Sequence, residues 1–167
     1  MTRSTLLLSL AAIIAVPTIA ARTAPAPHDK PAIEGVWRYR DEIDRRSDGS
    51  VFSAGPTAGY DGLLIFTGNG YMSATLVPKG RTWTLDAASP AQLRAAVEFT
   101  SAHAGRYEID PKAHTVRMES MVSLDRTEEG KWYPIQYALA QDTLSLSGPW
   151  NVHGEKLTFV LRLTRVK

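Results

Sequence analysis

The sequence has no cysteine among its 167 residues. This absence excludes an intramolecular disulfide framework and a lipid-modified cysteine as a membrane anchor. It does not argue against export, because the hydrophobic core of a domain of this length can stabilise it without disulfides.

Metal ligands and excess charge are also scarce. The four histidines are His28, His103, His114 and His153, and no two of them stand at the spacing of metal ligands. The formal net charge is +2, which creates no strong field for nucleic acid. We therefore predict no metal site, no cofactor and no nucleic-acid partner.

Residues 1–20 have the layout of a secretory signal peptide. An apolar run from Leu6 to Val16 follows a positive start, and the small residues Thr18 and Ala20 stand where a signal peptidase reads. The run is short for a transmembrane helix, although an uncleaved anchor is the alternative. We predict a periplasmic or secreted protein with no stable membrane anchor after cleavage.

Residues 21–32 are rich in proline and alanine, a composition typical of a disordered or polyproline-like tether. The folded domain is expected over residues 33–167. It contains about eight strand-like segments divided by short turns, which favours an antiparallel sandwich or barrel. These segments are Gly35–Ile43, Gly62–Thr67, Tyr71–Val77, Gly105–Asp110, His114–Leu124, Lys131–Ala140, Thr143–Ser147 and Leu157–Val166.

The clearest stretch is GLLIFTGNGYMSATLV, residues 62–77. Two apolar runs flank Gly68-Asn69-Gly70, and Gly and Asn adopt positive φ easily in tight turns. The stretch predicts a β-hairpin. In its second arm Met72, Ala74 and Leu76 form an apolar face.

One segment predicts a helix. Ser89 stands as the N-cap, Pro90 takes the first helical position and Gln92 completes a capping box. Gly105 is expected to terminate the helix. We predict an amphipathic helix from Ser89 to His103 that packs over one end or one side of the sheet, either as a lid or as a plug.

Alternation along the strands assigns an inner face, unless a bulge reverses it. Inward tyrosine hydroxyls need hydrogen-bond partners, which favours a lined cavity over a dry core. The predicted inner residues are Trp37, Tyr39, Asp41 and Ile43 in the first strand, Tyr107 and Ile109 in the fourth, Val116, Met118, Ser120, Val122 and Leu124 in the fifth, Tyr133, Ile135, Tyr137 and Leu139 in the sixth, and Leu157, Phe159, Leu161 and Leu163 in the last.

These features resemble a bacterial and fungal family of small lipocalin-like domains. The similarity rests on GVWR in the first strand, GLLIFTGNGYMSA at the hairpin, AGRYEID and LSLSG in later strands, and a last strand ending in Arg165. The resemblance implies a mainly β fold, an up-and-down barrel of about eight antiparallel strands with one inserted helix. It also implies an internal cavity for an apolar molecule, with Trp37 closing the barrel floor.

The chain departs from the family pattern at two places. Family members often have an inward histidine followed by an acidic position in the fifth strand, where this chain has Met118 and Met121. They often have an arginine at the start of the sixth strand, where this chain has Ile135 or Gln136. The departures imply a more apolar interior, which favours binding over acid–base chemistry.

Three residues are candidates for catalysis if the domain is an enzyme. Desolvation would raise the pKa of Asp41 on the inner face, so that it could act as a general base. The alternative is that Asp41 lies at the rim and pairs with Arg46 or Arg162. Tyr107 and Tyr137 could donate hydrogen bonds to a ligand carbonyl or a developing enolate, or instead bond to backbone.

The leading hypothesis is an exported barrel that binds a small hydrophobic or aromatic molecule without a cofactor. One alternative is a cofactor-free isomerase, cyclase or lyase in the same cavity. Another is a periplasmic protease inhibitor that acts through residues 21–32. The predicted ligand-binding residues are Tyr39, Met72, Leu76, Tyr107, Met118, Ser120, Tyr133, Tyr137 and Phe159.

Overall fold

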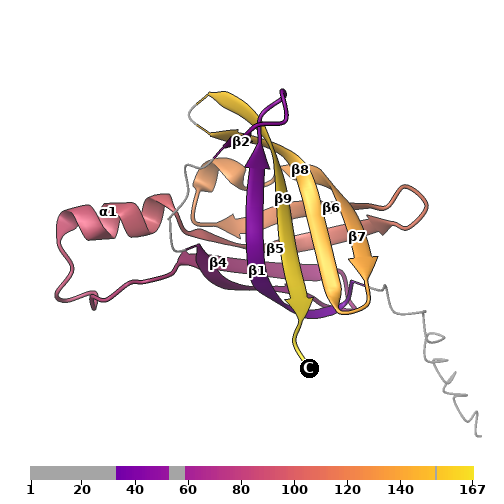
Figure 1. The fold of residues 1–167 in the computed structure, drawn as a ribbon. Helices are drawn as coiled ribbons and strands as arrows, with labels where there is room; N and C mark the ends of the chain where they lie inside the picture. Colours follow the sequence, from indigo (N-terminus) through magenta and orange to yellow (C-terminus); the bar gives the residue numbers. More distant parts are fainter. Residues whose placement is uncertain (1–32, 53–58, 153) are drawn as a thin grey trace, which may run out of the picture.

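The structure, a computed structural model, describes residues 33–52, 59–152 and 154–167. The predicted signal peptide and tether lie outside the described residues. The described part of the chain is mainly β, with one α-helix and one short 3₁₀ helix (Figure 1). Its elements are β1 (Gly35–Arg45), β2 (Val51–Phe52), β3 (Tyr60–Phe66), β4 (Tyr71–Pro78), α1 (Pro90–Glu98), β5 (Ser101–Asp110), β6 (Thr115–Ser123), η1 (Arg126–Glu128), β7 (Trp132–Ala140), β8 (Thr143–Val152) and β9 (Glu155–Arg165).

The strands form one closed antiparallel barrel. From β3 to β9 each strand pairs with the next along the chain, and β1 pairs with both β3 and β9. β2 only extends the sheet at the end of β1. The barrel wall thus consists of β1 and β3–β9, which confirms the predicted up-and-down barrel and excludes the sandwich.

The predicted hairpin is confirmed as β3 and β4, in which Phe66 pairs with Met72. The Thr67 N–H donates to the Tyr71 carbonyl oxygen at 2.9 Å, and the Gly70 N–H donates to the Thr67 carbonyl oxygen at 3.1 Å. Gly70 has a φ of 84°, a backbone conformation that glycine adopts without strain. The turn residues therefore set the register of the hairpin.

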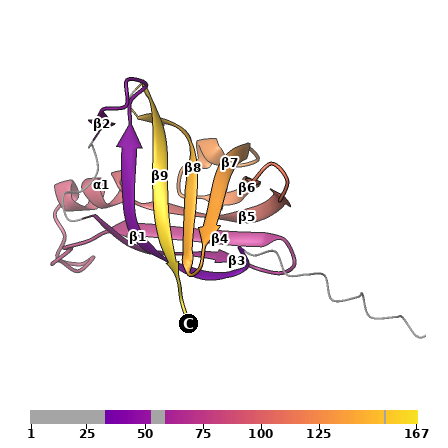
Figure 2. The same cartoon turned by 45° about the vertical axis from the view of Figure 1, so that its right-hand side comes forward.

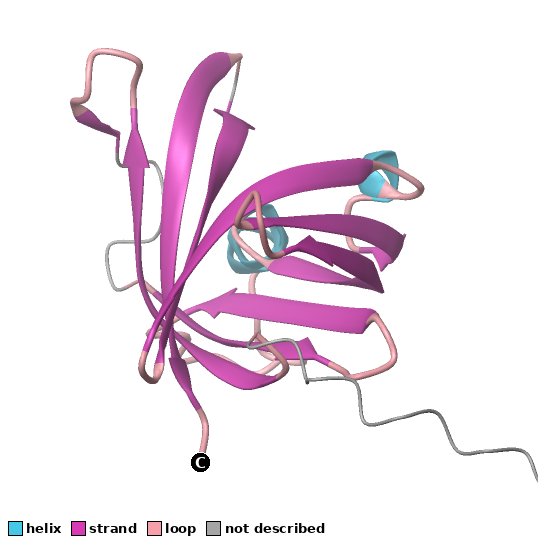
Figure 3. Ribbon diagram, turned by 90° about the vertical axis from the view of Figure 1, so that its right-hand side faces the viewer, coloured by secondary structure: helices cyan, strands magenta, loops and turns pink. Residues whose placement is uncertain are grey.

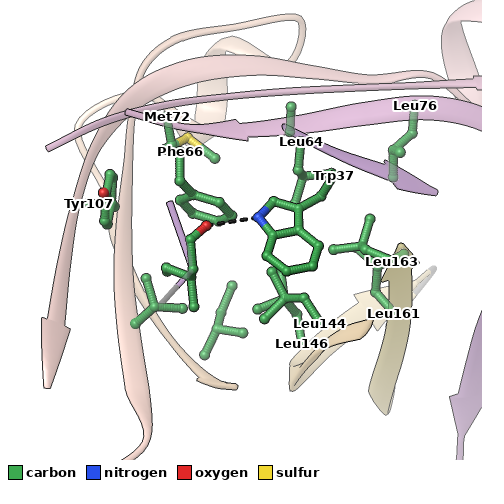
Figure 4. Packing of buried hydrophobic residues seen from close by; sticks show 14 residues of the cluster. Trp37, Leu64, Phe66, Met72, Leu76, Tyr107, Leu144, Leu146, Leu161 and Leu163 are labelled. Atoms are coloured by element: carbon green, nitrogen blue, oxygen red, sulfur yellow. Dashed lines mark hydrogen bonds between the residues drawn. The ribbon is translucent and has the colours of Figure 1, made fainter. Parts of the chain in front are cut away.

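Trp37 lies at one end of the barrel, which we call the closed end. Its side chain is 0 % exposed, and its Nε1 donates a hydrogen bond to the Ile33 carbonyl oxygen at 2.7 Å (Figure 4). The Arg165 guanidinium lies 4.1 Å from the centre of its ring. Apolar side chains from four strands surround it: Leu64, Phe66, Met72, Leu144, Leu146, Leu161 and Leu163. The closed end is therefore a packed hydrophobic core.

At the opposite end the wall divides into two groups of strands, and we call this the splayed end. β1 pairs with β3 only over residues 35–38, and β7 pairs with β8 only over residues 136–140. β9 pairs with both β1 and β8 well beyond these points. The two groups visibly diverge in Figures 2 and 3. The β1–β9–β8 group is thus not paired with its neighbouring strands β3 and β7 at this end.

The predicted helix begins as expected but ends early. The Ser89 hydroxyl accepts from the Gln92 N–H at 3.3 Å, and the Gln92 side chain accepts from the Ser89 N–H at 2.8 Å. α1 ends at Glu98, so the predicted extension to His103 was wrong. Residues 101–104 join β5 instead, because pairing with β4 supplies their backbone groups with partners. No residue of α1 is buried. The prediction that the helix packs over the sheet was therefore wrong.

A bulge also corrects the assignment of the inner face in β6. Ser120 and Val122 pair with neighbouring residues of β5, which leaves Met121 as the extra residue. Val122 is 66 % exposed and Leu124 is 49 % exposed, so their predicted inner positions were wrong. The partner of Ser120 is Gly105, which lies within β5 and does not end the helix.

Candidate functional site

A bulge in β1 directs the side chains of two acidic residues toward the inside of the barrel. Tyr39 pairs with Leu163, Asp41 pairs with Arg162, and Glu42 pairs with Leu161. Directly paired residues of neighbouring strands point to the same side of the sheet. Because Leu161 and Leu163 are buried inside the barrel, Glu42 faces inward together with Tyr39. Asp41 faces outward.

The predicted inner position of Asp41 was therefore wrong. Its carboxylate accepts a hydrogen bond from Arg162 Nε in an ion pair, and Arg40 Nε lies 3.4 Å from its other oxygen. This is the pairing with Arg162 that the sequence left as an alternative. The bulge displaces Ile43 to the outside as well, where it pairs with Val160.

Toward the splayed end, the inward-facing residues of β1 are Glu42 and Asp44. Burial, followed by repulsion from Asp44, raises the pKa of the Glu42 carboxyl from 4.5 to about 7. Burial also raises the pKa of Asp44, whose Oδ1 is shielded from solvent and accepts no hydrogen bond from any residue that the structure describes. Neither carboxylate belongs to an ion pair within the described residues.

Two tyrosines lie beside these carboxylates. The rings of Tyr39 and Tyr60 meet edge to face, with centroids 5.6 Å apart. Burial, together with the charge of Glu42, raises the pKa of both hydroxyls, that of Tyr60 to about 12. Both hydroxyls are therefore protonated at neutral pH. We call Tyr39, Glu42, Asp44 and Tyr60 the Glu42 cluster.

Three predicted ligand residues belong to the packed core. Met72, Leu76 and Tyr107 are all buried in the cluster around Trp37. The Tyr107 hydroxyl donates to the Thr67 carbonyl oxygen at 2.7 Å. The hydroxyl hydrogen is thus used in a bond to the backbone of the hairpin turn. This is the alternative role, a bond to backbone, that the sequence left open for Tyr107.

The remaining predicted ligand residues line the inner side of β6 to β9. Tyr133 lies on the rim of β7, where its hydroxyl donates to the Glu128 carboxylate. Ser120 is buried, whereas the other three are partly buried against the core. These four residues are Met118, Ser120, Tyr137 and Phe159.

His103 also belongs to the inner face, because it pairs with Ala74 of β4. Burial lowers the pKa of its imidazole, and the nearby Glu128 carboxylate opposes this shift only in part. The ring is therefore neutral at neutral pH. The sequence placed His103 at the end of a helix, so its position was missed.

Sequence reasoning also missed Glu42, Asp44 and Tyr60. In the run Asp41-Glu42-Ile43-Asp44, acidic residues occupy both alternating sets, so alternation does not decide which set faces inward. One signal was present: Arg162 stands between two leucines in an alternating strand and needs an outward partner. Using it requires the register between β1 and β9, the first and last strands of the barrel.

A cleft of about 610 Å³ lies outside the barrel, between α1 and the segment that follows β4. Its lining includes Trp83, Leu85, Leu93 and Val97. None of the predicted ligand-binding residues is among the described residues that line it. The cleft is thus separate from the barrel interior.

The described ranges also bear on two other classes of site. No helix there is long and apolar enough to span a membrane. Within the same ranges, no three His, Asp or Glu side chains gather as metal ligands would.

The closed up-and-down barrel of β1 and β3–β9 has the architecture of calycin-type binding proteins. Residues 34–161 match the model of the lipocalin-like domain family. The chain therefore belongs to this family. Comparisons with curated proteins and with solved structures gave no match.

Proposed function

We propose that the protein binds a small molecule with a hydrophobic or aromatic body inside the barrel, toward the splayed end. The main support is the contrast between the two ends. Trp37 is 0 % exposed at the closed end, whereas Trp150, which pairs with the inward Leu157, is 51 % exposed. Tyr60 and Phe159 are only partly buried. Inward aromatic side chains that solvent still reaches are the surface that a ligand would cover.

The expected affinity follows from that surface. A ligand that removes about 200 Å² of apolar area from water gains roughly 5 kcal/mol from this term. Ordering the ligand offsets part of the gain, and polar contacts add to it. A net gain of about 5 kcal/mol corresponds to a dissociation constant of about 0.2 mM, so binding in the range of hundreds of micromolar is expected.

Binding is tested by titrating the protein with dansyl amide, an uncharged probe that fluoresces in apolar surroundings. We expect saturable binding, weakened about tenfold in Phe159→Ala through loss of aromatic contact. Thr158→Ala is the matched control, because Thr158 is exposed on the outer side of the same strand. Circular dichroism verifies that both variants fold. Absence of saturable binding by folded protein, or equal loss in both variants, would contradict the proposal.

Native mass spectrometry of protein purified gently from its own cells addresses the natural ligand. A mass that leaves on unfolding would identify its chemical class. We also propose export, which rests on residues 1–20. The same spectrum should then show a chain beginning at Ala21, and a mass that includes residues 1–20 would contradict cleavage.

Glu42 favours a second candidate, a cofactor-free isomerase, cyclase or lyase. A carboxyl with a pKa of about 7 is suited to accept a proton near neutral pH. Burial raises the pKa of the Tyr39 hydroxyl beside it, so this group stays protonated and is suited to donate a hydrogen bond to a developing enolate. Here Glu42 takes the role that the sequence gave to Asp41. Chromatography of the co-purified compound, incubated with wild type or Glu42→Gln, tests this: conversion that persists in the variant would contradict it. The protease-inhibitor alternative depends on residues 21–32, outside the described part of the chain.

A further inference from the structure

Two carboxylates face the inside of the barrel, and none of the described residues supplies a counter-ion for them. Glu42 is paired with Leu161 and Asp44 with Phe159, so both share this face with apolar side chains. The neighbouring arginines are engaged elsewhere: Arg162 binds the outward Asp41, and Arg46 binds Glu155. Removing a carboxylate from water without a partner is unfavourable. The inner face at the splayed end therefore favours a positive charge.

One carboxylate oxygen of Asp44 also indicates that a ligand group is needed at this place. Asp44 Oδ1 has less than 1 Å² of accessible surface and no hydrogen-bond partner in the described part of the chain. Buried polar atoms are hydrogen-bonded in the great majority of cases, so this exception needs an explanation. A donor carried by a ligand would supply the missing partner.

The tyrosines supply the other half of such a site. Tyr39 and Tyr60 meet edge to face at 5.6 Å, beside the carboxylates. The faces of aromatic rings attract cations, and aromatic side chains commonly surround ammonium groups in binding sites. The same rings provide apolar contact for the carbon atoms next to the charge.

We propose that the ligand carries a protonated amine, which the Glu42 cluster holds while the apolar body extends along the inner face toward Phe159. This inference rests on the proposed binding function, because it names the chemical class bound at the same site. An inorganic cation would share the charge but would make no use of the tyrosine rings.

The test compares three probes with the same chain and different head groups: octylamine, octanol and octanoate. Each is used to displace dansyl amide at about pH 8, where Glu42 is ionised, and at about pH 5. At the higher pH we expect octylamine to bind at least about tenfold more tightly than octanol, and octanoate to bind most weakly. The preference for the amine should shrink at the lower pH, because protonation neutralises Glu42.

Variants assign the preference to the cluster. The double variant Glu42→Gln, Asp44→Asn should bind octylamine and octanol equally, with octanol affinity within about twofold of wild type. Glu108→Gln is the matched control, because it removes a carboxylate from the exposed side of β5 and should keep the preference. The pH comparison needs no variant, so it decides the inference even if the double variant does not fold.

The outcomes separate this inference from the proposed function. Equal affinity for octylamine and octanol, with dansyl amide bound, would overturn the amine and leave the apolar site in place. An amine preference that survives in the folded double variant would overturn the role of the cluster. Loss of the preference on adding calcium chloride, but not sodium chloride of equal ionic strength, would assign the site to an inorganic cation. Failure of all probes to bind would overturn both proposals.

Discussion

Asp41 and Glu42 are neighbours in β1, yet their carboxylates lie on opposite sides of the barrel wall. Asp41 is paired with Arg162 on the outside, and Glu42 stands inside, opposite Leu161. A single extra residue before Asp41 creates this arrangement. The two carboxylates consequently differ in their expected effect on stability.

Glu42 should make the stability of the protein depend on pH. Its pKa is raised from 4.5 to about 7 in the folded state, so the folded protein binds more protons than the unfolded chain between these values. The free energy of unfolding should therefore fall as pH rises through this window, by up to roughly 3 kcal/mol. Glu42→Gln should remove the part of this fall that Glu42 causes and be more stable than wild type at about pH 8. Urea unfolding across this pH range measures both effects.

Asp41→Asn is the control for that measurement. It breaks a half-exposed ion pair, which should cost less than about 1 kcal/mol and leave the pH dependence in place. If Asp41→Asn abolished the dependence and Glu42→Gln preserved it, the register of β1 described above would be wrong.

Gly105→Ala should be severely destabilising. An added Cβ would lie 1.7 Å from the Glu119 carbonyl oxygen, so the backbone of the neighbouring strand would have to move. We expect a loss of about 3 kcal/mol or more in the free energy of unfolding. At Gly148 an added Cβ would first meet the Phe159 side chain at 3.2 Å, which can rotate. Gly148→Ala should therefore cost less than about 1 kcal/mol, and equal effects in the two variants would contradict the close approach at Gly105.

Trp37→Ala should cost about 3–5 kcal/mol, because it empties the centre of the closed end and removes the donor to the Ile33 carbonyl oxygen. Trp150→Ala removes the same side chain from an exposed position and should cost less than about 1 kcal/mol. Thermal and urea unfolding of both variants gives the comparison. A Trp37→Ala protein as stable as wild type would refute the packed closed end.

Tyr107→Phe should lower stability without affecting binding. The variant loses the hydrogen bond to the Thr67 carbonyl oxygen, which is worth about 1 kcal/mol. Because this hydroxyl is already used within the hairpin turn, affinity for dansyl amide should stay the same. Weaker binding with unchanged stability would instead mean that Tyr107 donates to the ligand.

Local signals predicted some parts of the structure well. The Gly68-Asn69-Gly70 turn and its flanking apolar runs led to the hairpin, because turn residues and alternation act over a few positions. The capping box at Ser89 likewise marked the start of α1. The end of α1 was missed, because pairing of residues 101–104 with β4 outweighed a weak helical pattern.

The candidate site was predicted only in part, for a related reason. Alternation placed Tyr39 and Phe159 on the inner face, where they lie. It misplaced Asp41 and Val122, because each follows a bulge, and one inserted residue reverses every later position of a strand. It could not select Glu42 and Asp44, since the neighbouring positions carry an acid as well.

By itself the sequence determined the mainly β composition, the hairpin, the inward Trp37 and the resemblance to lipocalin-like domains, because these depend on residue types and short spacings. Only the tertiary structure decided which carboxylate enters the barrel. That choice depends on the register between β1 and β9, which are far apart in the chain and meet only when the barrel closes. Closure places Arg162 outside to hold Asp41, and it leaves Glu42 and Asp44 inside with no counter-ion among the described residues.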